Sequence, residues 1–244
     1  MMQTMEQQND KISFFKGIRD GVPIALGYFA VAFTLGITAG KAGMNALQSS
    51  LMSALMLASA GEFAAISMIG SGAGVMEMIV TTVVINMRYL LMSSALSQKV
   101  QQNRSFLHRI FMSYAVTDEI FGISMTVPGK LNPFYQYGAA SVAGPGWVIG
   151  TFLGTVVGMV LPAPVMSAMS VAIYGMFLAV VVPPARKNKI IAAVVVISMS
   201  VSLLFQSIPG LKNISSGFQI ILLTVLISAA AAILFPVQEE QHAS

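Results

Sequence analysis

The chain has 244 residues, of which 56% are hydrophobic and only 9% are charged, with a formal net charge of +4 and no cysteine. A soluble domain carries roughly a quarter charged residues, so the composition excludes that class and predicts an integral membrane protein. Without cysteine, neither a disulfide framework nor a thiolate metal site can form. The basic residues lie between apolar runs, which favours contact with membrane lipid and gives no support for nucleic-acid binding.

The first 21 residues are polar and charged, so they predict a tail and not a cleavable signal peptide. Lys11, Lys16 and Arg19 place this tail, residues 1–21, on the cytoplasmic side by the positive-inside rule. We expect one transmembrane domain over residues 22–237 and a short second tail at 238–244. The predicted location is the cytoplasmic (inner) membrane, with several passes through it.

Apolar runs cover residues 22–41, 45–69 and 75–97, and each can cross a hydrocarbon core, which needs roughly 20 residues. A fourth segment, residues 110–128, is interrupted by Thr117-Asp118-Glu119, so we expect it to be buried among other helices or broken at the acids. Further runs follow at 139–161, 165–182, 190–208 and 216–236. The sequence therefore predicts an all-α polytopic membrane protein with seven or eight transmembrane segments.

Four glycines recur at every fourth position of the fifth run: Gly146, Gly150, Gly154 and Gly158. This spacing puts all four on one face of a helix, where the missing side chains allow close helix packing. We therefore predict a packing seam along this face.

The chain contains an internal repeat. A constant shift aligns Met52-Ser53-Ala54 with Met166-Ser167-Ala168, and Gly61 with Gly175. The repeat pairs residues 22–97 with residues 139–208, three segments each, and leaves 110–128 as a linker and 216–236 as a final span. The halves are parallel if every segment crosses, or inverted if one segment in each half turns back at Gly61 and Gly175. We favour inverted halves with broken helices, because two basic loops then share the side of the N-terminus.

Charged residues inside apolar segments are costly in a bilayer and are functional candidates by default. Glu62 follows Gly61 in a long apolar run, and a helix break at Ser59-Ala60-Gly61 would surround it with free backbone groups. Arg88 and Asn86 lie near the centre of the third segment. The Arg88 guanidinium suits a carboxylate, which belongs either to a substrate or to Glu62; a buried ion pair that only joins helices is the alternative.

Asp118 and Glu119 are adjacent in the sequence, so on a helix they point in different directions. One can pair with Arg88 while the other titrates, as in proton coupling inside a membrane. The alternative is a helix start at this point, capped by Thr117 or Asp118.

No catalytic triad, phosphate-binding glycine loop or zinc-binding spacing occurs in the sequence. We therefore expect neither an enzyme nor an ATP-driven pump, and neither a cofactor nor a metal.

Four motifs resemble the AzlC-type branched-chain amino-acid exporters, of which this chain would be the large subunit. They are Gly21-Val22-Pro23, Ala58-Ser59-Ala60-Gly61-Glu62-Phe63, Asn86-Met87-Arg88-Tyr89 and Thr117-Asp118-Glu119. Two positions depart from the family pattern, because Glu62 stands where glutamine is expected and Tyr89 where histidine is expected. The resemblance implies a second, smaller membrane subunit of the AzlD type.

These residues lead to the hypothesis of a proton-coupled secondary transporter that exports small apolar amino acids. Its substrate-binding or coupling residues would be Gly61, Glu62, Asn86, Arg88, Asp118, Glu119 and Gly175. The alternatives are a membrane scaffold subunit, whose buried charges only assemble helices, and a channel for small solutes.

Overall fold

The computed structural model describes residues 2–101, 105–158, 160–162, 188–208 and 216–235, with a few isolated positions (164, 178, 181, 182, 185, 186 and 214). Within these ranges the named elements are all helices, and one isolated bridge joins Val100 to Leu131. The helices are α1 (Met2–Lys41), α2 (Ala46–Leu55), α3 (Ser59–Ser71), α4 (Val75–Asn86), α5 (Arg88–Lys99), α6 (Phe106–Tyr114), α7 (Asp118–Thr126), α8 (Pro133–Gly158), α10 (Lys189–Ser207) and α11 (Ser216–Leu234).

Three stretches of the described chain are long and apolar enough to cross a membrane: Gln8–Lys41, Val75–Lys99 and Pro133–Gly158. The all-helical membrane class is therefore confirmed. The predicted seven or eight spans and the repeat stay predictions, because much of 165–187, including Gly175, lies outside the described residues.

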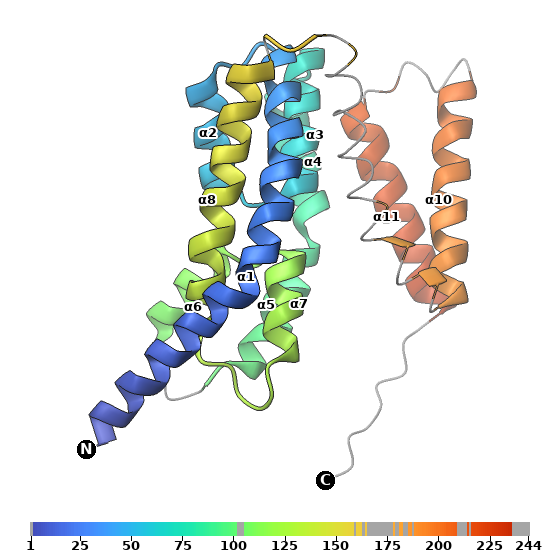
Figure 1. Cartoon of the computed structure of the whole chain (residues 1–244). Coiled ribbons are helices and arrows are strands. Elements are labelled where there is room, and N and C mark those ends of the chain that lie inside the picture. Colours follow the sequence, from blue (N-terminus) through green and yellow to red (C-terminus); the bar gives the residue numbers. More distant parts are fainter. Residues whose placement is uncertain are drawn as a thin grey trace.

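Helices α1 and α8 form the central pair of the molecule and run side by side in the same direction (Figure 1). The glycine face of α8 lies directly against the α1 backbone. A Cβ on Gly150 would lie 2.6 Å from the Phe29 carbonyl oxygen, and one on Gly154 would lie 1.9 Å from that of Phe33. The predicted packing seam is confirmed. As the first helices of the two predicted repeats, α1 and α8 have the parallel arrangement, not the inverted one that we favoured.

Helix α1 begins about 20 residues earlier than expected, because the stretch interpreted as a tail is helical from Met2. Glycines extend the α1–α8 contact into this stretch, where a Cβ on Gly17 would lie 1.9 Å from the Tyr135 carbonyl oxygen. Tyr135 also donates a hydrogen bond to Asp20 (2.7 Å). Packing against α8 thus overrides the polar composition of this segment.

The second apolar run is a re-entrant hairpin and not a crossing. Helix α2 starts beside the C-terminal end of α1 with an Asn45–Gln48 capping box, and α3 returns to that end, where Gly70 faces Ala42. The chain turns at Met56–Ala58, between the two helices. The predicted turning back of this segment is confirmed, but the predicted break at Ser59-Ala60-Gly61 is wrong, because these residues already form the first turn of α3.

Helices α4 and α5 carry the chain to the other end of the molecule, with a kink at Met87 between Asn86 and Arg88. A second hairpin then enters from that end. Helix α6 runs toward the middle of the molecule, where Tyr114 at its C-terminal end donates a hydrogen bond to the Ala54 carbonyl of α2. Helix α7 runs back toward the lower end (Figure 1), where Lys99 of α5 donates to the Met125 carbonyl (2.6 Å). The predicted break at the acids is confirmed, with Thr117 as the N-cap of α7.

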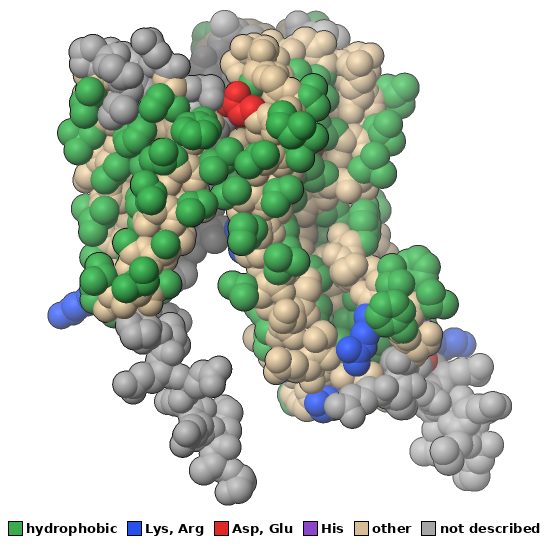
Figure 2. All heavy atoms as spheres, turned by 180° about the vertical axis from the view of Figure 1, so that it is seen from behind, with side chains coloured by type: hydrophobic (Ala, Val, Ile, Leu, Met, Phe, Trp, Pro, Cys, Tyr) green, Lys and Arg blue, Asp and Glu red, His purple; other side chains and the backbone are tan. Residues whose placement is uncertain are grey.

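Helices α10 and α11 stand beside this body, with α11 against α4 (Figure 1). The flanks of the molecule are covered by hydrophobic side chains, and the Lys and Arg side chains visible from behind gather mainly toward the lower end (Figure 2). Large exposed side chains on the flanks include Leu51, Val83, Leu91, Ile197 and Leu226. An apolar surface of this extent fits contact with lipid and not with water.

The glycine seam gives a test of the fold. Gly154→Ala would place a methyl group on the Phe33 carbonyl of α1, and overpacking of this kind costs about 1–3 kcal/mol. The thermal unfolding temperature in detergent should fall accordingly. Gly144→Ala on the same helix is the control, because a Cβ there meets nothing within 4 Å; it should leave the unfolding temperature unchanged or raise it. If both variants changed the unfolding temperature equally, the close α1–α8 contact at Gly154 would be contradicted.

Candidate functional site

The two hairpins bring their turns together in the middle of the molecule, around one small pocket. Its walls come from α1, both hairpins, α5 and α8. The lining residues are Tyr28, Leu57, Ser59, Tyr89, Thr117, Asp118, Glu119 and Trp147. The space inside is about 10 Å³, which is room for about one water molecule. We call it the central pocket, and its size shows that the structure is closed around it.

Arg88 and Asp118 form an ion pair beside the central pocket, with 2.7 Å between Nη1 and Oδ2. The guanidinium also lies over the Tyr89 ring and donates to its hydroxyl (3.3 Å). The predicted pairing of Arg88 with one acid of α7 is therefore confirmed, and Glu62 is not its partner. Both side chains keep about a third of their surface exposed, so the pair borders open space instead of filling a sealed core.

Glu119 does not pair with Arg88 in the described structure. It accepts a hydrogen bond from Tyr28 of α1 instead. The Tyr28 hydroxyl lies 2.6 Å from Glu119 Oε2 and 2.6 Å from Thr117 Oγ1. Thr117 also accepts the Ile120 N–H (3.3 Å) and thereby starts α7. The two acids thus diverge as the sequence predicted, and each is tied to a different helix.

Glu62 is fully buried, and its carboxylate is held by two donors on different helices. Ser53 of α2 donates to Oε1, and the Trp147 indole of α8 donates to Oε2 (2.8 Å). Trp147 packs edge-on against Tyr28, with ring centroids 5.3 Å apart. Among the described residues, no cation forms an ion pair with Glu62. Trp147 therefore separates Glu62 from the central pocket and couples the two.

Gly61 and Asn86 meet directly. A Cβ on Gly61 would lie 2.9 Å from both amide atoms of Asn86, so the missing side chain lets Asn86 approach the α3 backbone closely. Asn86 ends α4 at the kink, and its Oδ1 is buried without a hydrogen-bond partner in the described structure. The structure thus places the predicted site residues Gly61, Glu62, Asn86, Arg88, Asp118 and Glu119 in one region. Gly175 lies outside the described residues.

Helices α3 and α7, the second helices of the two hairpins, both begin at the central pocket. Their partly positive N-terminal ends therefore point toward it from opposite halves of the molecule. Helix α7 starts with the Thr117 cap. Helix α3 starts after Ala58, and no side chain of the described structure caps it. Its first N–H groups are therefore available to an anionic ligand.

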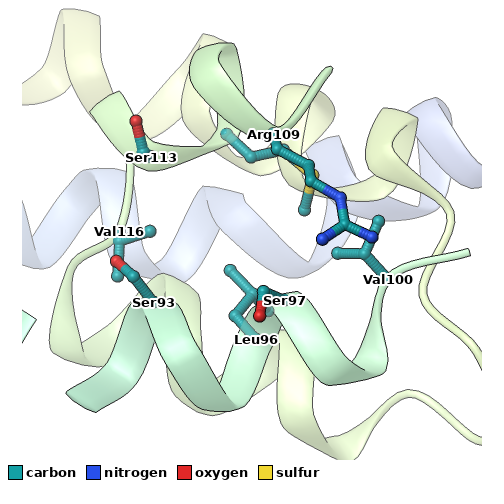
Figure 3. A pocket seen from close by; sticks show the side chains of 8 residues that line it. Ser93, Leu96, Ser97, Val100, Arg109, Ser113 and Val116 are labelled. Atoms are coloured by element: carbon teal, nitrogen blue, oxygen red, sulfur yellow. The ribbon is translucent and has the colours of Figure 1, made fainter. Parts of the chain in front are cut away.

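A separate pocket of about 40 Å³ lies between α5 and α6, under the Arg109 side chain and beside the hydroxyls of Ser93, Ser97 and Ser113 (Figure 3). None of the predicted site residues lines it. In the described part of the chain, no group of three or more His, Asp or Glu side chains is placed to hold a metal ion.

The family profile described as AzlC protein matches residues 23–161, which include every residue that lines the central pocket. The chain belongs to the AzlC family.

Relatives of this AzlC-family chain are membrane proteins. An uncharacterized membrane protein of Archaeoglobus fulgidus is 30% identical over 78% of this chain and 84% of its own length. The inner membrane protein YgaZ of Escherichia coli K12 is 25% identical over 58% of this chain and 60% of its own length. An uncharacterized membrane protein of Helicobacter pylori J99 is 23% identical over 59% of this chain and 66% of its own length. No solved structure matches the chain.

Sequence reasoning on this AzlC-family chain missed the aromatic side chains that complete the site. Trp147 is the one tryptophan of the chain and lies in the middle of the glycine-rich segment, where its N–H needs a partner. Tyr28 lies in the first span and has the same need for its hydroxyl. A buried donor inside an apolar run is the signal that would have identified both.

The Arg88–Asp118 pair predicts energetic coupling between α5 and α7. In a double-mutant cycle with Arg88→Gln and Asp118→Asn, measured by thermal unfolding in detergent, residues in one network couple by about 0.5–3 kcal/mol. The matched control is a second cycle that combines Arg109→Gln with Asp118→Asn. Because Arg109 lies at the separate pocket, the effects of these two substitutions on stability should be additive. Additive effects of the Arg88 and Asp118 substitutions would contradict the pair.

Proposed function

We propose that this AzlC-family protein is a secondary transporter that exports small apolar amino acids, including branched-chain ones, across the cytoplasmic membrane, coupled to protons. The observation that carries the proposal is the convergence of two half-helices, α3 and α7, on one charged pocket from opposite ends of the molecule. Discontinuous helices whose ends meet near the membrane midplane are typical of substrate sites in secondary transporters.

The charges around the central pocket match the two ends of a zwitterion. The substrate carboxylate would bind the Arg88 guanidinium and the uncapped start of α3, with the Asn86 amide nearby. The ammonium group would bind Asp118 or Glu119, which face the same pocket. In this scheme the carboxylate competes with Asp118 for Arg88, so substrate binding loosens the tie between α5 and α7.

The walls of the central pocket suit an apolar side chain. Leu57, Tyr28 and Trp147 supply non-polar surface, and no further charged group is needed to recognise leucine or valine. Because the present space holds about one water molecule, substrate entry requires the hairpins to move apart. We interpret the structure as the occluded state of a transport cycle.

Carboxylates would carry the proton. Glu62 is buried with two neutral donors and no paired cation among the described residues, and an isolated carboxylate is costly there unless it is neutralised. His108 lies away from the pocket, next to Tyr137 (2.8 Å), so it is not in a position to take over this role. Proton binding at Glu62 would act on the pocket through Trp147.

The wider assembly is also part of the proposal. We propose that the six apolar runs other than the two hairpins cross the membrane, with the N-terminus of α1 in the cytoplasm and a small AzlD-type membrane subunit as partner. The family membership supports the partner, and the Lys and Arg side chains at the lower end of the molecule support the orientation (Figure 2). We propose no catalytic chemistry.

Substitution of Glu62 tests the transport mechanism. Glu62→Gln keeps the size of the side chain and can still bond Ser53 and Trp147, but it cannot exchange a proton. We expect normal membrane insertion, with leucine counterflow in inverted vesicles that no longer depends on the proton gradient. The measurement is uptake of labelled amino acids with and without that gradient.

Asp20→Asn is the control, since this carboxylate contacts Tyr135 outside the central pocket; it should keep the gradient dependence. If Glu62→Gln transports like the wild type at every pH, Glu62 has no part in coupling. If the wild type itself shows no counterflow with any amino acid, the proposed function is wrong.

A further inference from the structure

Four side chains along the α4–α5 span each carry a buried polar atom that has no hydrogen-bond partner in the described structure. They are Glu77 through Oε1, Thr81 through Oγ1, Asn86 through Oδ1 and Arg88 through Nε. Thr81 is fully buried. Buried polar atoms are almost always paired with protein or water, so four such atoms on one span call for an explanation.

Three of the four, Glu77, Thr81 and Arg88, lie on one face of the span, whereas Asn86, nine residues after Glu77, points to the opposite side. At about 100° per residue, positions four and eleven residues after Glu77 fall within about 40° of its direction. With a rise of 1.5 Å per residue, the line from Glu77 to Arg88 covers about 16 Å. Its inner end is the Arg88–Asp118 pair at the central pocket, and its outer end is the first turn of α4.

A larger cavity, broadly open to the outside of the molecule, lies at the outer end of this line. Its volume is about 550 Å³, and it is lined by Met76, Glu77 and Val80 of α4 and by Ile214, Phe218 and Ile221 on the side of α11. Glu77 is therefore shared between the line and the cavity. The position of Glu77 at a helix N-terminus accounts for its charge, but not for the buried oxygen without a donor.

We propose that the Glu77–Thr81–Arg88 face is the polar path by which the substrate, an amino-acid zwitterion, leaves the central pocket toward the end where α4 begins. The proposal rests on the proposed transport function. Water would fill the path when it opens and would satisfy its three unpaired atoms. In the present structure Thr81, near the middle of this face, is fully buried, so the path would be closed there. Glu77 would attract the ammonium end of the zwitterion at the exit.

Cysteine accessibility tests this path directly, because the chain has no cysteine of its own. Thr81→Cys and Glu77→Cys are made in the full chain, in membrane vesicles, and treated with a membrane-impermeant, positively charged thiol reagent. Ser71→Cys, at the exposed C-terminal end of α3, identifies the face to which the reagent must be added. Val83→Cys, at nearly the same depth but 58% exposed on the outer flank, is the matched control.

Thiols react as thiolates, which need water, so we expect Thr81→Cys to react at least about tenfold faster than Val83→Cys from the Ser71 face. Leucine should slow the reaction by occupying the path. A Thr81→Cys protein that elutes as folded protein but reacts no faster than Val83→Cys overturns the proposal. If Thr81→Cys does not fold, the rate of Glu77→Cys, with and without leucine, decides in the same way.

The two proposals fail separately. Labelling of Thr81→Cys that leucine does not slow, in a protein without counterflow, would overturn both the transport function and the substrate path. Leucine counterflow by the wild type with an unreactive Thr81→Cys would keep the transport function and move the exit elsewhere.

Discussion

The close contact of α1 and α8 is the constraint on which the rest of the structure depends. Because the α8 glycines lack side chains, the two backbones approach within contact distance over most of their length. Each helix then anchors one of the hairpins. Helix α8 holds α2 through hydrogen bonds between the hydroxyls of Thr151 and Ser53 (2.7 Å) and between those of Thr155 and Ser49 (2.8 Å), and α1 holds α7 through Tyr28.

Broken helices inside a membrane are tolerated only where the freed backbone groups are buried in protein or line a cavity. Both turns of this structure meet that condition, because each is covered by the other hairpin and by aromatic side chains of the central pair. Tyr114 joins the two hairpins by bonding the Ala54 carbonyl near the first turn. The polar contacts that hold the hairpins are thus also the contacts that place Glu62, Asp118 and Glu119 around the pocket.

The sequence predicted the apolar segments, the glycine seam and the charged residues of the site, because each rests on a local pattern. It placed the turn of the first hairpin at Gly61 and not at Met56–Ala58, since the short helices α2 and α3 together look like one span in composition. It also did not identify Tyr28 and Trp147, whose roles depend on partners far away in the sequence. Glu77 was overlooked because its importance comes from the unpaired state of its oxygen and from the cavity beside it, which only three-dimensional packing defines.

The central claim is that the pocket between the hairpin turns binds a small apolar amino acid. Trp147 is the only tryptophan of the chain and lines this pocket, so its fluorescence reports on the site without any label. Titration of the purified protein with leucine or valine should change the emission in a saturable manner, whereas glutamate or lysine should not. An emission spectrum that stays constant with every amino acid, in a protein that remains folded, would contradict the account.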